Sequence, residues 1–433
     1  MGAAPCRGLS ARDERIVDLL RRLVRINTEH ADPEPGAPYG RGCAEALDLV
    51  MRECEALGFE TRRVDERVAW AQVGSTGPLA AFPVHLDVVP AGEGWDHDPY
   101  AADVLDGVLY GRGCMDNKVG AAVLVVLLAE HAARDLPCRL RVIFGTDEET
   151  GMSDLRKYVD AGEEMPTMGF VPDASFPVVR GEKARLHLRL SRAVEDDGLV
   201  LRGGSMANMV PAEARATLPD GREVSERGRS AHGSTPERGE SAIRPLVARL
   251  VESGMDPDGT LGEVARLLCA DLTGAALGID EPDEVFGHTS MNLGTIELAS
   301  GRLTAELDVR FGCAITPGEV VGRVRRSLGG AWEVEVIQEK PLHLVPEDDP
   351  CVRVLLSAYE RVTGERGDCS VMAGGTYASY LPALVAFGPK LPGAHSGAHG
   401  VNEHVSLEDV ARAADIYSEA IRGIIGLAAS RED

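Results

Sequence analysis

Apolar residues along the first part of the chain follow two different periods. Residues 12–26 and 43–57 place them at helical spacing, with one buried face each. Residues 61–73 and 78–85 have the short apolar runs that are typical of strands. Residues 119–129 are apolar on every side, which predicts a buried helix. This run of about 11 residues is far shorter than the roughly 20 that a membrane-spanning helix needs.

Residues with acidic or imidazole side chains follow these strand-like segments. His85-Leu86-Asp87 closes one strand, and Asp147-Glu148-Glu149 follows another apolar segment, residues 139–144. Asp173 follows a third, and Asp116 directly precedes the buried helix. Alternating strands and helices with acids at the strand ends predict an α/β fold with a mainly parallel sheet. Its site would form outside the carboxyl ends of the strands.

The pattern changes near residue 181. Residues 185–192 and 212–218 alternate between apolar and polar, and residues 291–298 and 303–311 flank a Ser-Gly turn as a hairpin would. With helices expected at 240–252 and 317–328, this region indicates an inserted α+β domain with antiparallel strands.

Helical patterns return at residues 350–363 and 406–427, so we expect the chain to rejoin its first domain. The predicted organisation is a catalytic domain formed by residues 1–180 and 346–433, with an inserted lid domain at 181–345. A chain of 433 residues is too long for one ordinary core, which agrees with two domains.

The composition excludes several classes of partner. A formal charge of −24 repels phosphate backbones and anionic lipid, so we expect neither nucleic-acid nor membrane binding. Nine cysteines without any Cys-x-x-Cys pair indicate reduced thiols and a cytoplasmic protein. The first ten residues lack a long apolar core, so we expect no signal peptide.

The candidate ligands combine nitrogen and carboxylate donors without thiolates, a set that suits Zn²⁺, Mn²⁺ or Co²⁺. They are His85, Asp116, Glu148, Glu149, Asp173 and one of His395, His399 or His404. Five ligands with one bridging carboxylate would hold two metals about 3.5–4 Å apart. Because Glu148 and Glu149 are adjacent, we expect one to bind metal and the other to act as a base.

Together these residues resemble the M20 metallopeptidases, and in particular the PepV-like (Sapep-type) bacterial dipeptidases. The resemblance rests on His85-Leu86-Asp87, Gly111-Arg112-Gly113 with Asp116 and Lys118, Asp147-Glu148-Glu149 and Pro172-Asp173-Ala174. Segments typical of that branch are Glu164-Met165-Pro166-Thr167, Gly181-Glu182-Lys183 and Gly374-Gly375-Thr376-Tyr377-Ala378. One departure is Asn117, where the family commonly has a second Asp.

The resemblance implies a role for each ligand. His85 and Asp173 would bind one metal, Glu149 and His399 would bind the other, and Asp116 would bridge them. His399 is preferred because residues 399–403 look like the family's His-x-x-Asn-Glu, with His395 as the alternative. Asp87 would orient His85. Glu148 would be the general base for a metal-bridging water.

The resemblance also implies roles for residues of the lid. His232 would stabilise the oxyanion, while Asn208 and Arg310 would hold substrate. Gly375 would offer its backbone N–H to the terminal carboxylate of the substrate. Simpler roles stay open: a turn histidine for His232, a turn cap for Asn208 and a structural ion pair for Arg310.

The implied activity is that of a dipeptidase with two divalent ions, Zn²⁺ before Mn²⁺ or Co²⁺, acting on small peptides or amides. Alternatives are a deacylase of N-acyl amino acids, a pathway-specific amide hydrolase, and an amide-forming or binding protein. A monomer with a self-sufficient lid is favoured over a homodimer. The remaining histidines are expected to be ordinary surface or packed residues, namely His30, His97, His131, His187, His288 and His343.

Overall fold

A computed structural model describes residues 9–256 and 258–430 of the chain. The segment in which no signal peptide is expected lies mostly outside these residues, as does Cys6. The described residues divide into two compact units, and each is described by itself below. The first comprises residues up to Gly181, Leu344–Ser370 and residues from Thr376 on, and the second comprises Glu182–His343 and Val371–Gly375. The sequence pattern gave no sign that residues 371–375 belong with the insert.

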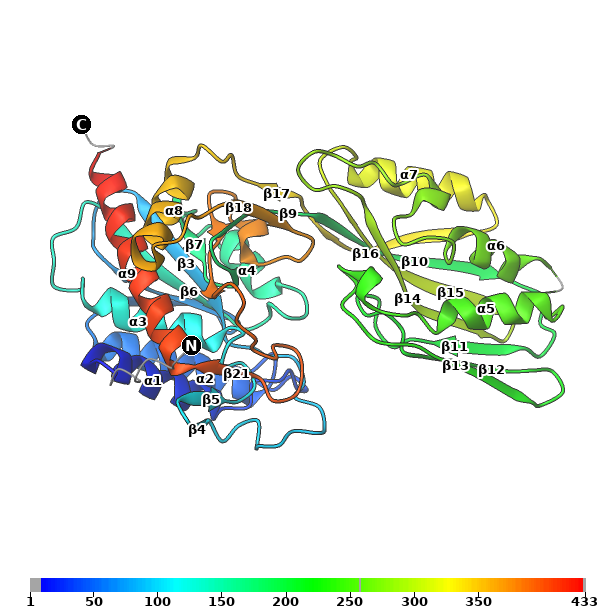
Figure 1. Ribbon diagram of the computed structural model, residues 1–433, viewed down its shortest axis with the longest axis horizontal. Helices are drawn as coiled ribbons and strands as arrows, with labels where there is room; N and C mark the ends of the chain where they lie inside the picture. The colour runs from blue at the N-terminus through cyan, green and yellow to red at the C-terminus, as the bar shows by residue number, and fades with distance from the viewer. Residues whose placement is uncertain (1–8, 257, 431–433) are drawn as a thin grey trace. The chain divides into compact units, whose positions relative to one another are not determined.

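The first unit contains helices on both sides of a mixed sheet (Figure 1). Its helices are α1 (Ala11–Val24), α2 (Arg41–Ala56), α3 (Lys118–Ala129), α4 (Ser153–Asp160), α8 (Pro350–Thr363), α9 (Leu407–Ala429) and the short η3 (Tyr377–Tyr380). Its early strands are β1 (Glu60–Asp65), β2 (Val68–Val73), β3 (Leu79–His85), β4 (Asp103–Leu105), β5 (Val108–Tyr110) and β6 (Arg139–Gly145). Its later strands are β7 (Met168–Val171), β8 (Ala174–Ser175), β9 (Val178–Glu182), β17 (His343–Leu344), β18 (Cys369–Met372), β19 (Val385–Ala386), β20 (Pro389–Lys390) and β21 (His404–Ser406).

Four parallel strands form the centre of this sheet. Its order is β1-β2-β6-β3-β7-β19-β9-β17, and the neighbours within β6-β3-β7-β19 are parallel. The pairs β1–β2, β2–β6 and β9–β19 are antiparallel. The predicted α/β class with a mainly parallel sheet is therefore confirmed for the centre of the sheet. The segment 61–73, predicted as one stretch of strand, forms the hairpin of β1 and β2, because Asp65 accepts the Arg67 N–H in a tight turn.

The two faces of the sheet bury alternate residues of each central strand. Phe82, Val142 and Phe170 pack into a core with helices α1, α2, α3, α8 and α9. Ile143 and Val171 face the other way, into a smaller core with α4 and η3. Helix α3 is buried on almost every side, as its apolar sequence predicts. Among the described residues, no helix is both long enough and apolar enough to span a membrane.

The second unit is an antiparallel sheet with helices packed against it (Figure 1). The strand order is β13-β12-β11-β14-β15-β10-β16. The strands are β10 (Ala184–Ala193), β11 (Val200–Gly203), β12 (Glu213–Thr217), β13 (Glu223–Arg227), β14 (Ser290–Ala299), β15 (Arg302–Phe311) and β16 (Glu333–Lys340). The helices are α5 (Ile243–Glu252), α6 (Thr260–Leu267), α7 (Pro317–Leu328), and the short η1 (Pro236–Arg238) and η2 (Ala275–Leu277). The predicted hairpin is present as β14 and β15.

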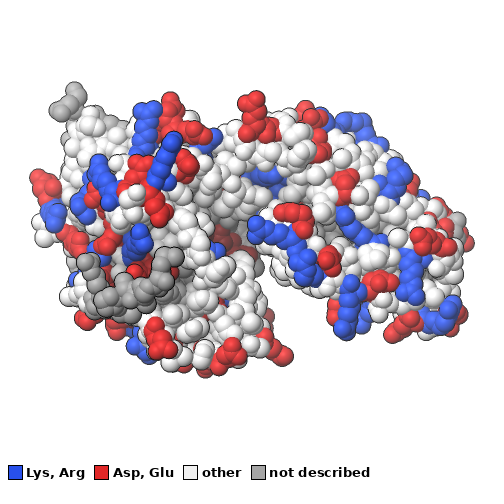
Figure 2. Space-filling model, in the orientation of Figure 1, with Lys and Arg blue, Asp and Glu red and all other residues white. Residues whose placement is uncertain are grey.

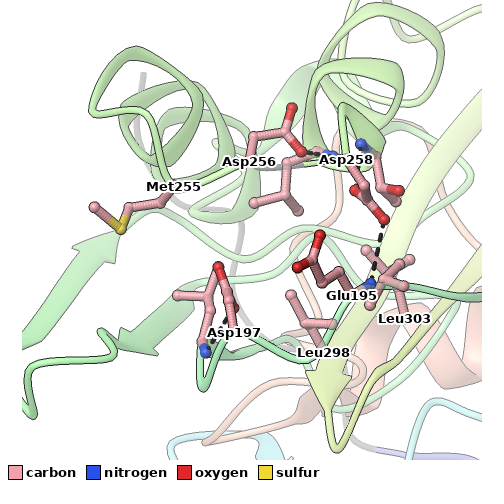
Figure 3. A pocket seen from close by; sticks show the side chains of 11 residues that line it. Glu195, Asp197, Met255, Asp256, Asp258, Leu298 and Leu303 are labelled. Atoms are coloured by element: carbon pink, nitrogen blue, oxygen red, sulfur yellow. Dashed lines mark hydrogen bonds between the residues drawn. The ribbon is translucent and has the colours of Figure 1, made fainter.

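A small cavity of about 20 Å³ in the second unit is lined by several acids (Figure 3). The three aspartates among them accept hydrogen bonds from backbone N–H groups, and Asp197 accepts that of Leu199. Asp256 accepts the N–H groups of Leu261 and Gly262, and Asp258 accepts those of Thr260 and Glu195. These bonds fix the start of α6, so the cavity is a structural feature.

Charged side chains of both signs are interspersed over the visible face of each unit (Figure 2). The acidic excess of the chain is therefore spread over solvated surface as well as gathered in the cluster described below. Cys43, Cys54, Cys114 and Cys138 in the first unit are buried free thiols.

Candidate metal centre

His85 ends strand β3 with a fully buried imidazole. Its Nδ1 lies 3.0 Å from the main-chain carbonyl of Asp87 and 3.5 Å from the Asp87 carboxylate. The carbonyl can only accept, so Nδ1 carries the proton and Nε2 is left to bind a cation. Nε2 lies 3.1 Å from Asp116 Oδ1 and 3.7 Å from Asp173 Oδ2. Asp116 and Asp173 are thus both beside the nitrogen predicted to bind metal.

Asp116 lies between two imidazoles. Its Oδ1 faces His85, and its Oδ2 lies 3.1 Å from His399 Nε2. The same nitrogen of His399 lies 3.2 Å from Glu149 Oε1. One carboxylate therefore contacts both halves of the predicted ligand set, which is the arrangement that a bridging ligand requires.

The pairing of strands explains how segments so distant in sequence meet. Strand β21 pairs with β5, which places residues 399–404 beside the turn that carries Asp116. His399 has a positive φ of 61°, a conformation that a residue with a side chain rarely adopts. Such a conformation costs about 1–3 kcal/mol and is concentrated at functional sites.

Glu148 and Glu149 follow strand β6, which pairs in parallel with β3. Their backbone N–H groups donate to the two carboxylate oxygens of Asp87, at 3.2 and 3.1 Å. Asp87 therefore holds the loop of both glutamates as well as lying behind His85. The Oε1 atom of Glu148 is buried and has no hydrogen-bond partner among the described residues.

The charges in this cluster shift one another. Burial and the nearby Asp173 raise the pKa of Glu148 well above its usual value, and burial and Asp116 raise that of Glu149 to about 7. Hydrogen bonds to Asp116 and Glu149 raise the pKa of His399 to about 11. Burial opposes a charge on Asp116, but hydrogen bonds from the two histidines outweigh it and lower its pKa. The cluster therefore favours added positive charge.

The donor spacing fits divalent ions. Two ligands that lie about 2.1 Å from one tetrahedral ion stand about 3.4 Å apart. The pairs of His85 with Asp116 and of His399 with Glu149 lie at 3.1 and 3.2 Å. Two sets of donors converge closely enough to hold an ion, His85 with Glu148 and Asp173, and His85 with Asp116 and Glu149. The unpaired Glu148 oxygen is a further acceptor, which a water molecule or an ion would satisfy.

The other two candidate histidines near the end of the chain, His395 and His404, do not contact the cluster residues that the structure describes. His404 bonds the main-chain carbonyl of Asn402 at 2.8 Å and its ring lies near Tyr110. His395 is exposed and shows no bond to the cluster residues that the structure describes. His399 is the late histidine that contacts Asp116 and Glu149.

The lid residues predicted from the resemblance all lie in the second unit. The segments of Asn208 and His232 are neighbours, because the Asn208 carbonyl accepts the Gly233 N–H at 2.6 Å. His232 Nδ1 accepts the backbone N–H of Ser234 at 3.2 Å. The neutral ring then carries its proton on Nε2, which makes Nε2 a donor.

Arg310 is bound by two acceptors within the second unit. Its guanidinium donates to the Asp308 carboxylate at 2.8 and 3.1 Å and to the Ala373 carbonyl at 2.8 Å. The ion pair foreseen as the simpler role of Arg310 is therefore present within β15. The bond to the Ala373 carbonyl ties β15 to the segment that ends at Gly375. At Gly375 an added Cβ would lie only 1.6 Å from Lys340 Nζ, so a larger residue would displace the ammonium group that donates to Glu182 at 2.6 Å.

Sequence reasoning quoted Glu403 and Arg112 within motifs but gave them no role. Glu403 is fully buried, and its carboxylate bonds Arg112 at 2.8 Å. It also accepts the backbone N–H groups of Gly113, Met115 and Asp116, at 2.9, 3.0 and 3.1 Å. Glu403 thus holds the loop of the central carboxylate from the segment that carries His399. The sequence signal that could have pointed to this role is the position of Glu403, four residues after His399.

The comparisons with known proteins agree with this geometry. A model of the peptidase family M20/M25/M40 matches residues 81–423, and the chain belongs to this family. Among its relatives is the Bacillus subtilis protein named "Putative dipeptidase YtjP", which is 30% identical over 93% of this chain and 96% of its own length.

Solved structures share the fold at lower identity. Human carnosine dipeptidase 1 has a TM-score of 0.64 at 16% identity, covering 96% of this chain and 97% of its own. Bacillus subtilis YXEP, described as a dinuclear metal binding peptidase of the M20 family, has a TM-score of 0.59 at 14% identity, with 96% and 99% covered.

Replacing Glu403 with Gln tests the buried pair with Arg112. The change leaves a buried guanidinium without its counter-charge, so we expect the free energy of unfolding to fall by about 3 kcal/mol. Glu419→Gln is the control, because its partners Arg361 and Arg422 are 66% and 61% exposed and such pairs contribute at most about 1 kcal/mol. Denaturant unfolding of both variants measures the difference, and equal losses would contradict this role of Glu403.

Proposed function

We propose that this protein is a dipeptidase that uses two divalent metal ions, with Zn²⁺ preferred over Mn²⁺ or Co²⁺. The observation that carries the proposal is the position of Asp116, whose two oxygens each lie 3.1 Å from a different imidazole nitrogen. Family membership and a 30% identical relative that carries a dipeptidase name support the choice of substrate.

In the proposed assignment, His85 and Asp173 bind one ion, Glu149 and His399 bind the other, and Asp116 bridges them. Neutral imidazole and carboxylate donors suit Zn²⁺ and similar ions. The hydrogen bond from His85 Nδ1 to the Asp87 carbonyl supports Nε2 as the ligating atom.

Glu148 is proposed as the general base. When bound, the two ions would polarise the amide carbonyl and lower the pKa of the attacking water. Glu148 takes the proton of that water and returns it to the leaving amine. Burial and Asp173 raise its pKa, which makes the carboxylate a stronger proton acceptor. Its free Oε1 gives it an atom for this task.

We assign the lid residues to substrate in the same proposal. His232 Nε2–H would donate to the developing oxyanion, and Gly375 would donate its N–H to the terminal carboxylate of the substrate. Asn208 and Arg310 would orient the peptide. Because the insert is long enough to form an enlarged lid, we propose a monomer that completes its own site, with a homodimer as the alternative. The cytoplasm remains the expected location.

Replacing Glu148 with Gln tests the base directly. The amide cannot accept a proton, so we expect kcat for a dipeptide to fall at least about 100-fold, within the range general-base catalysis contributes. Metal content, measured by elemental analysis on the same sample, should equal that of the wild type. Near-normal turnover, or loss of a metal ion together with activity, would contradict the assignment.

Metal binding should be linked to proton release. His399, with a pKa of about 11, holds its proton at neutral pH, and an ion must displace it. The apparent affinity should therefore tighten as pH rises from 6 to 8, by about tenfold per pH unit for each proton displaced. Calorimetric titration of Zn²⁺ in buffers of different ionisation enthalpy measures the protons released. Binding that is independent of buffer and pH would contradict the proposed ligands.

A panel of free dipeptides and their N-acylated counterparts separates the proposed dipeptidase from a deacylase. We expect kcat/KM to be at least about tenfold higher for the free dipeptides, a difference of about 1.4 kcal/mol in transition-state binding. Faster hydrolysis of the acylated series would establish the deacylase. Two bound ions without hydrolysis of either series would favour an amide-forming or binding protein.

A further inference from the structure

The loop that carries the proposed base has a second anchor, Asp147, to which sequence reasoning gave no role. Asp147 is buried, and its Oδ1 accepts the Thr150 hydroxyl at 2.6 Å. Its Oδ2 accepts the Ser153 N–H at 2.9 Å and the Tyr39 hydroxyl at 3.0 Å. Asp147 thus closes the turn that contains Glu148 and Glu149, and one of its bonds comes from outside the turn.

That outside bond comes from a loop near the N-terminus. The Ala31 N–H donates to the Tyr39 carbonyl at 3.1 Å, which closes the loop and brings His30 beside Tyr39. The two rings stack with centroids 4.5 Å apart and planes 5° apart. Gly40, with a φ of 95°, ends the loop where an added Cβ would lie 2.7 Å from the Ala31 Cβ.

His30 bonds both ends of the same turn. Its Nε2 lies 2.8 Å from the Thr146 carbonyl, to which it donates, and its Nδ1 lies 3.0 Å from the Thr150 hydroxyl. The ring also lies 3.7 Å from the Asp87 carboxylate, which accepts the N–H groups of Glu148 and Glu149. His30, expected from the sequence to be an ordinary histidine, therefore lies against the catalytic loop.

Tyr39 can act only as a donor to Asp147. Burial, together with the Asp147 carboxylate, raises the pKa of Tyr39 to about 12, so its hydroxyl keeps its proton. The hydroxyl of Ser153 also lies against the Tyr39 oxygen and can donate to it. From the opposite side, Asp154 accepts the N–H groups of Thr146 and Asp147, at 2.6 and 2.8 Å.

We propose that Tyr39 and His30 are positioning residues for hydrolysis, which act through Asp147 and Thr146 to fix Glu148 and Glu149. The inference rests on the proposed function, because it assumes that Glu148 is the base. Four side chains hold the turn: Asp87 from the segment after β3, Asp154 from helix α4, and Tyr39 and His30 from the N-terminal loop. Mutation of residues that support the ligands of a metal site typically lowers activity or metal affinity 10–100-fold.

The test uses substitutions that keep the ring stack. Tyr39→Phe removes only the hydroxyl, and His30→Phe replaces the imidazole by a phenyl ring that can stack but has no nitrogen to bond the turn. We expect each to lower kcat by about tenfold while KM and metal content stay at wild-type values. His30→Gln, whose amide can still donate to the Thr146 carbonyl, should recover most of the loss.

The matched control is Tyr359→Phe, which removes a hydroxyl that donates to Glu365 at 3.1 Å from a buried ring in the same unit. It should leave kcat within twofold of wild type. Values of kcat within twofold for both Tyr39→Phe and His30→Phe would overturn the proposal. Equal losses in Tyr359→Phe, or losses only in proportion to metal content, would also overturn it.

Amide hydrogen exchange separates this inference from the proposed function. The peptide that spans residues 145–152 should exchange faster in Tyr39→Phe and His30→Phe than in wild type and in Tyr359→Phe. If wild type hydrolyses no peptide, the proposed function fails while faster exchange still establishes the anchor. If wild type is active and Glu148→Gln is not, but exchange and kcat are unchanged in both loop variants, only the inference fails.

Discussion

The shared carboxylate of Asp116 is the constraint on which the rest of the site depends. The carboxylates of Asp116, Glu148, Glu149 and Asp173 gather close together in space, and burial of that much negative charge is costly unless cations compensate it. Two imidazoles approach Asp116 from opposite sides, each at 3.1 Å. Burial and the neighbouring carboxylates raise the pKa values of Glu148 and Glu149, so negative charge on either residue calls for a further cation. Divalent ions between these donors would cancel that charge.

Around this cluster, a second set of buried acids accepts hydrogen bonds from backbone N–H groups and so fixes the loops that carry the proposed ligands. Glu403 holds the Asp116 loop, Asp87 holds the two glutamates, and Asp154 holds the start of the same turn. Glu403 and Asp87 come from segments remote in sequence from the loops they hold, whereas Asp154 lies in helix α4, which directly follows its loop. The parallel centre of the sheet makes this arrangement possible, because β3, β6 and β7 end at the same edge.

Much of the fold and site could be predicted from local signals. Helix α3 and the β14–β15 hairpin follow from hydrophobic period, and His399 was chosen over His395 from the motif around it. The roles of Glu403 and His30 could not be predicted in this way. Their bonds join residues about 290 and 116 positions apart, respectively, and such contacts leave no periodic pattern. Residues 371–375 also lie with the second unit through contacts that no local pattern reveals.

The number of ions that Asp116 holds tests the central claim most directly. Elemental analysis of the full chain, equilibrated with Zn²⁺ and freed of excess, should give two ions per chain. The variant Asp116→Ala should retain at most one, whereas Asp173→Ala should lose one and keep the ion at Glu149 and His399. A single ion in the wild type, or two ions retained by Asp116→Ala, would contradict a bridging carboxylate.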